Sequence, residues 1–257
     1  MAKWTFFGKV LPERVPVTWL APLEGSARQP NLGFSFTFRV AIHASQVVVD
    51  LDVTEGTPDL LTMRNAASNC LRTITDFVGY ERGCYFDVEI TSAVSQETDD
   101  WTVFGIEIPV LASKRTVHQI NSVDAGFFRT IAQNIPAQIV LADFREAMRV
   151  PIGTGFFCYR AIEAMMQSVK VGREKDSAAW DRLREVLLID RTVLDDIKQH
   201  ADPPRHGKPS AMSDSDRARI FELTDEIIRR FFEYLTRGAT ALPPQDFSIL
   251  RSNTGGT

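Results

Sequence analysis

Residues 33–42 read Gly-Phe-Ser-Phe-Thr-Phe-Arg-Val-Ala-Ile, and this stretch decides the fold of the first half of the chain. Its even positions are all apolar, whereas Ser35, Thr37 and Arg39 alternate with them at the two-residue period of a β-strand. The next segment, residues 47–53, places valine or leucine at its odd positions. Because few residues separate the two runs, they predict an antiparallel hairpin.

Other segments of the first half add to this hairpin. Alternating apolar residues predict strands over 85–90 and 102–110, and candidate strands over 4–10 and 15–20. Between these runs, residues 60–78 carry apolar side chains at three- and four-residue spacing, which is typical of an amphipathic helix. We therefore expect a helix packed on an antiparallel sheet.

Residues that favour the start and the end of a helix flank this segment. Thr57 can cap the first amides and Pro58 suits the first helical position, while Gly79 or Gly83 can end the helix. The local signals and the apolar period thus agree.

The second half is predicted to be helical, because the alternation stops after about residue 111. The expected helices cover residues 156–170, 180–189 and 192–200, followed by a long last helix. Ser213 and Asp216 resemble a capping box at its start, and Gly238 is a stop signal. The expected breaks are Pro136, Pro151, Gly172, Pro203, Pro204 and Pro243.

These elements predict an α+β protein with an N-terminal antiparallel sheet and packed helix, followed by a C-terminal α-helical bundle. The expected domains are a strand-rich part over residues 1–115 and a bundle over 116–242. Residues 243–257 lack periodicity and are expected to form a flexible tail.

Composition excludes several classes of function. The net charge of −4 gives no chain-wide positive field for nucleic acid or anionic lipid. Charged residues interrupt every apolar run, so no membrane span is expected, and no secretory signal is apparent. Three cysteines without a CxxC pair suit a reducing compartment, which predicts a cytoplasmic protein.

No cofactor or metal is predicted. Gly153-Thr-Gly155 before a helix lacks the third glycine of a dinucleotide-binding loop and reads as a helix entry. His43 and His118 stand alone, and no Cys/His spacing resembles a zinc site. Asp195 and Asp196 point in different directions on a helix, so we expect them to be solvated.

Two further functional alternatives concern the strand at 33–42 and a later helix. Phe34, Phe36 and Phe38 could form a base-stacking surface, but their alternation favours a place in the core. Cys158 lies in an apolar helical context and is expected to be an inert buried thiol rather than a nucleophile.

The most unusual local cluster is residues 200–208, which gather His200, Arg205, His206 and Lys208. Histidine transfers protons near neutral pH, and arginine and lysine hold phosphate, so the ingredients for RNA cleavage or phosphate binding are present. In the structural alternative, prolines set a turn before the last helix and Arg205 pairs with a helix acid such as Glu163.

The order of residues 157–163, 180–188 and 201–207, followed by a long amphipathic helix, resembles the HEPN family over roughly residues 137 to 238. This resemblance implies a helical bundle that dimerises and either cleaves RNA without a metal or binds it, in defence or stress responses. By this resemblance, Arg205 would stabilise the phosphate, and His206 would help to deprotonate or protonate the ribose oxygens. In this sequence the two residues are adjacent, whereas catalytic members of that family separate them.

The first functional hypothesis is a binding or interaction module with RNA or another protein as partner, forming a homo-oligomer. His200, Lys208 and Glu163 are the expected binding residues. The alternatives are a metal-independent ribonuclease that uses Arg205 and His206, and a purely structural or dimerisation protein.

Overall fold

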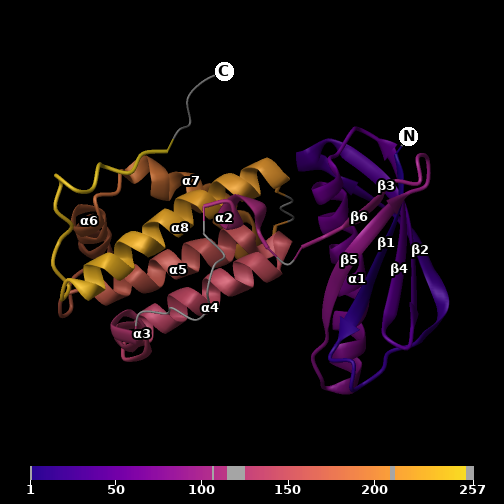
Figure 1. Cartoon of the computed structure of the whole chain (residues 1–257), viewed down its shortest axis with the longest axis horizontal. Helices are drawn as coiled ribbons and strands as arrows, with labels where there is room; N and C mark the ends of the chain where they lie inside the picture. Colours follow the sequence, from indigo (N-terminus) through magenta and orange to yellow (C-terminus); the bar gives the residue numbers. More distant parts are fainter. Residues whose placement is uncertain (1, 106, 115–124, 209–211, 253–257) are drawn as a thin grey trace. The chain divides into compact units, whose positions relative to one another are not determined.

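The computed structural model describes residues 2–105, 107–114, 125–208 and 212–252. The chain divides into a sheet unit, Met1–Ile106, and a helical unit, Glu107–Thr257. The predicted α+β class is confirmed, because an antiparallel sheet with one packed helix precedes a helical region (Figure 1).

The sheet unit holds a six-stranded sheet in the order β2-β3-β4-β1-β5-β6, and every neighbouring pair is antiparallel. Its strands are β1 (Lys3–Leu11), β2 (Trp19–Gln29), β3 (Phe34–His43), β4 (Gln46–Glu55), β5 (Asp87–Ser95) and β6 (Trp101–Val103). The β3–β4 hairpin is as predicted, with Val40 opposite Val49. The β1 strand lies between β4 and β5 and is therefore central.

Two predicted strands differ from the structure. The strand expected over 102–110 is shorter, since β6 ends at Val103. Pro109 begins the short helix α2 (Pro109–Ala112), whose Leu111 is buried in the core of the helical unit. The strand expected over 15–20 lies mainly further along the chain, as β2. Since β2 is an edge strand exposed on both faces, its sequence lacks the alternation that burial of one face imposes.

Helix α1 (Leu60–Arg82) lies against one face of the sheet (Figure 1). Asp59, rather than the expected Thr57, caps it by accepting from the Thr62 amide at 2.8 Å. Gly83 ends it in the left-handed conformation at φ 63°. The core beneath α1 includes Phe34 and Phe36, as predicted.

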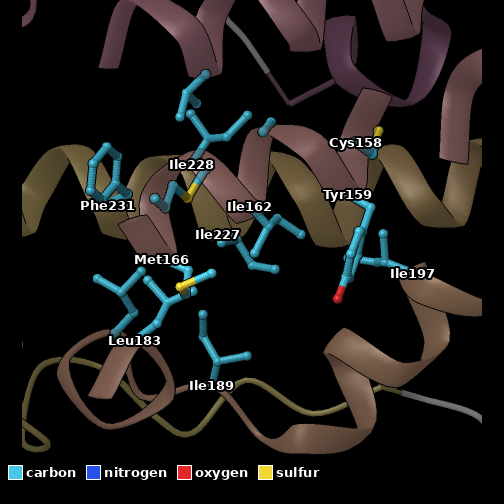
Figure 2. Close-up of a cluster of buried hydrophobic side chains, with 14 of the residues drawn as sticks. Cys158, Tyr159, Ile162, Met166, Leu183, Ile189, Ile197, Ile227, Ile228 and Phe231 are labelled. Carbon is cyan, nitrogen blue, oxygen red and sulfur yellow. The ribbon is translucent and has the colours of Figure 1, made fainter. Parts of the chain in front are cut away.

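The helical unit packs around α5 (Thr154–Val169), which contacts four other helices. These are α4 (Ile135–Arg149), α6 (Asp176–Leu187), α7 (Arg191–Arg205) and α8 (Asp214–Thr236), and α3 (Ala125–Ala132) precedes them. Figure 2 shows part of the resulting core, where Ile162 and Met166 of α5 lie near Ile227 of α8. None of the helices in the described ranges has the length and apolarity needed to span a bilayer.

Two buried arginines of α8 cap other helices. Arg217 donates to the carbonyl of Met148 at 2.8 Å, near the end of α4. Arg230 donates to the carbonyls of Leu187 and Leu188 at 3.1 and 2.8 Å, at the end of α6. Because the last carbonyls of a helix lack amide partners within the helix and carry partial negative charge, each guanidinium stabilises the end that it reaches.

The prediction that residues 200–208 form a loop is wrong in part, because α7 continues through Pro203 and Pro204 to Arg205. Each proline lacks the amide hydrogen that would bond to the carbonyl four residues earlier, so the carbonyls of Gln199 and His200 lose that partner. The carbonyl of His200, whose partner four residues on is Pro204, instead lies against Gly155 of α5. A Cβ at Gly155 would be 2.5 Å from that oxygen, so the α5–α7 contact requires glycine here.

Candidate functional site

An ion pair joins the predicted cluster at the end of α7 to α5. Arg205 pairs with Glu163 through Nη1 and Oε1 at 3.4 Å, the pairing expected in the structural alternative. His206 is the exposed C-cap of α7, and the Lys208 amide donates to the carbonyl of Pro203 at 2.8 Å. The structure therefore brings together Arg205 and Glu163, while the side chains of His206 and Lys208 remain exposed.

His200 belongs to a different cluster, which faces α8. Its Nε2 accepts from Arg219 at 3.3 Å, because a guanidinium can only donate. Burial foremost, and then the positive charge of Arg219, lower the pKa of His200, although Asp216 and Asp196 oppose this. A neutral imidazole is thus the form that fits this position.

Asp196 lies beside His200 and is buried, not solvated as predicted. Its carboxylate accepts from Gln199 at 2.8 Å and from Ser252 at 2.7 Å, and it pairs with Arg219. Burial alone would raise the pKa of Asp196, but these donors hold it below its usual value. A buried carboxylate is stable only with such hydrogen-bond and ion-pair partners, which explains how Asp196 can be buried.

A cleft of about 250 Å³ opens where α5, α6 and α7 meet. Its walls combine aromatic, cationic and acidic side chains from all three helices. They are Tyr159 of α5, then Ser177, Trp180, Asp181 and Arg184 of α6, then Arg191, Leu194, Asp195 and Lys198 of α7. On α7 the polar members recur every three or four residues and so share one helix face.

Tyr159 is the least expected member of the cleft. Its side chain is 8% exposed, and its ring stacks on Trp180 with centroids 5.7 Å apart and planes at 22°. Figure 2 shows the ring beside Ile197, with the hydroxyl at the end away from α5. No hydrogen-bond partner for that hydroxyl exists among the residues that the structure describes. A hydroxyl in the wall of a cleft that has no protein partner can bond to a ligand.

The Tyr159 hydroxyl stays protonated at neutral pH. Burial, together with the carboxylates of Glu163 and Asp202, raises the pKa of Tyr159 to about 12. The hydroxyl can therefore donate a hydrogen bond into the cleft as well as accept one.

Among the described residues, one of the three cations that line the cleft has no acidic partner. Arg184 pairs with Asp181, and Arg191 pairs with Asp195 at 3.3 Å. Lys198 has no acidic partner within the described ranges. Among the residues that line the cleft, three cations therefore face two carboxylates.

Two family models match the chain. The N-terminal domain of a family described as a domain of unknown function (DUF8168) matches residues 4–104, and the C-terminal domain of the same family matches residues 126–236. Among curated proteins and among solved structures, no match was found. The resemblance to the HEPN family was wrong, because the matching model for the helical unit is that of DUF8168 and no HEPN model matches.

Proposed function

Because the chain belongs to the DUF8168 family, whose function is unknown, we propose a function from the cleft itself: the protein is a binding module whose helical unit holds a nucleotide. The proposal rests on Tyr159, whose ring is almost buried against Trp180 and whose hydroxyl has no partner among the described residues. The cytosol remains the expected compartment, since Cys70, Cys84 and Cys158 are all unpaired.

The chemistry of a nucleotide matches the cleft in three respects. Aromatic side chains bind a base by stacking, and Trp180 is half-buried in the wall. Lys198, which has no acidic partner in the described ranges, can hold a phosphate by a charge-assisted hydrogen bond, and the paired Arg184 and Arg191 lie in the same wall. The Tyr159 hydroxyl can bond a sugar or base edge. The volume of about 250 Å³ is below that of most ligand pockets, so we expect a single nucleotide rather than a longer one to enter the cleft.

Binding is preferred over RNA cleavage by Arg205 and His206. The Arg205 guanidinium is paired with Glu163, and His206 lies on the exposed end of α7. His200, the other histidine of the predicted cluster, is neutral and bonded to Arg219. A cleaving pair would need both groups aimed at one phosphate.

Trp180 gives a direct test, because the other three tryptophans, Trp4, Trp19 and Trp101, belong to the sheet unit. Titration of the whole protein with a nucleoside monophosphate should quench its tryptophan fluorescence, and Trp180→Phe should abolish the change. A short single-stranded RNA forms the second arm, and its binding without that of the free nucleotide would assign the cleft to RNA.

Lys198→Glu should weaken nucleotide binding about tenfold or more, because it removes a cation and adds a carboxylate near the phosphate. Lys208→Glu is the matched control, since this exposed lysine lies outside the cleft. An unchanged affinity in Lys198→Glu, or an equal loss in both variants, would rule out the cleft as the phosphate site.

A further inference from the structure

Among the described residues, the edge strand β2 has a row of backbone groups that pair with no other strand. It pairs with β3 on one side and ends the sheet on the other. Its side chains are almost all exposed, and Leu20 is 98% exposed. A long exposed edge is a template for another strand unless it is interrupted or protected. Which strand fits it is decided by the residues along it.

The regular part of β2 is a short, symmetric segment. After an irregularity that begins at Trp19, residues Leu23–Gln29 pair with β3 without interruption. Pro22 precedes this segment and Pro30 follows it. Proline has no amide hydrogen, so a ladder on the free edge is limited to the residues between the two prolines. The centre of that segment is Ser26.

An antiparallel pairing of this segment with itself is complementary in charge. With Ser26 opposite Ser26 of a second copy, Glu24 lies opposite Arg28, and the two-fold axis creates that pair twice. Gly25 lies opposite Ala27, so small residues occupy the neighbouring positions. Glu24 contacts Arg39 at 3.5 Å, but its side chain is 71% exposed and remains accessible.

The charge pairs and Ser26 lie on the sheet face opposite α1. Glu24, Ser26 and Arg28 share one face by the two-residue period, together with their β3 partners Arg39 and Thr37. The other face of β3 carries Phe36, which is buried beneath α1. Helix α1 therefore does not cover the side chains that would form the contact.

We propose that two copies of this chain associate through β2, by antiparallel pairing of Leu23–Gln29 centred on Ser26, and so join their sheets into one. This association goes beyond the nucleotide binding proposed for the helical unit and uses none of its residues. A second copy fits better than an unrelated peptide, because its own segment supplies both opposite charges at the required positions.

Cross-linking tests the register. Directly opposite residues of antiparallel strands have Cα atoms about 4.5–5.5 Å apart, within the range that a disulfide bridges. In a Cys84→Ser background, which removes the exposed cysteine, Ser26→Cys should form a disulfide dimer under mild oxidation. Arg28→Cys is the control, since its copy would lie about 13 Å away along the partner strand.

Charge reversal tests the pairing. In sedimentation over a concentration series, the wild-type chain should move between its 28.9 kDa monomer and a dimer. Glu24→Arg and Arg28→Glu should each weaken the dimer about tenfold, because each places like charges opposite twice, and the double variant should restore it. Glu81→Arg, exposed on α1, should change nothing. A wild-type chain that stays monomeric, or equal cross-linking of Ser26→Cys and Arg28→Cys, would overturn the proposal.

Discussion

Among single residues, His200 is held in an environment that disfavours its charged form. Burial and Arg219 lower its pKa from the ordinary value of 6.5, and protonation would remove the bond that Nε2 accepts. Between that lowered pKa and 6.5 the unfolded chain binds protons more readily than the folded one, so stability decreases as the pH falls through this range. Above pH 6.5 this contribution is fully present.

We therefore expect His200→Gln, which keeps an acceptor but does not titrate, to lose part of this pH dependence. The free energy of unfolding by denaturant should be compared at about pH 7.5 and about pH 5.5 for both chains. Carboxylates such as Asp143 contribute equally to both and cancel in the difference. If the wild-type chain and His200→Gln lose the same free energy of unfolding between about pH 7.5 and about pH 5.5, protonation of His200 does not contribute to the pH dependence of stability.

Between elements, the contact of α5 with α7 depends on Gly155. Alanine in a helix is normally more stable than glycine by about 1 kcal/mol. Here we expect the opposite sign: Gly155→Ala should destabilise the helical unit by about 1–3 kcal/mol, because the new methyl would overlap the His200 carbonyl. Denaturant unfolding measures this, with Ser168→Ala on the same helix as the control. A stabilised Gly155→Ala chain would show that α7 moves aside at little cost.

The elements that were predicted from the sequence are those with local signals. Helix α8 carries the Ser213 cap, with the Asp216 amide bonded at 3.0 Å, and its apolar stripe is buried. The β3–β4 hairpin has strict alternation. By contrast, β2 has two exposed faces and Pro203 reads as a helix breaker, so only the tertiary structure reveals the edge strand and the extended α7.

Prediction from local sequence signals has the same limit for the candidate site. Sequence reasoning singled out residues 200–208 because their chemistry is adjacent along the chain. Tyr159, Trp180 and Lys198 come from three helices, and each alone resembles an ordinary core aromatic or a solvated lysine. The spacing of Arg191, Asp195 and Lys198 on one helix face was a usable signal, but nothing in the sequence places Tyr159 beside it.

At the scale of the whole molecule, the two units have separate hydrophobic cores. The core of the sheet unit extends from Phe6 to Ala93, and that of the helical unit from Leu111 to Leu242, with no residue in common. A unit with its own core and about 100 residues is large enough to fold alone. We therefore expect residues 1–106 to fold without the rest of the chain.

The isolated sheet unit should give a strand-rich circular dichroism spectrum and one cooperative thermal transition. Its transition should also be recognisable in the whole chain, because the core that melts is the same in both. Phe36→Ala, which empties a buried position, should lower that transition in the fragment and in the whole chain alike. A fragment that shows no cooperative transition, although the whole chain does, would mean that the sheet unit depends on residues beyond 106 for its stability.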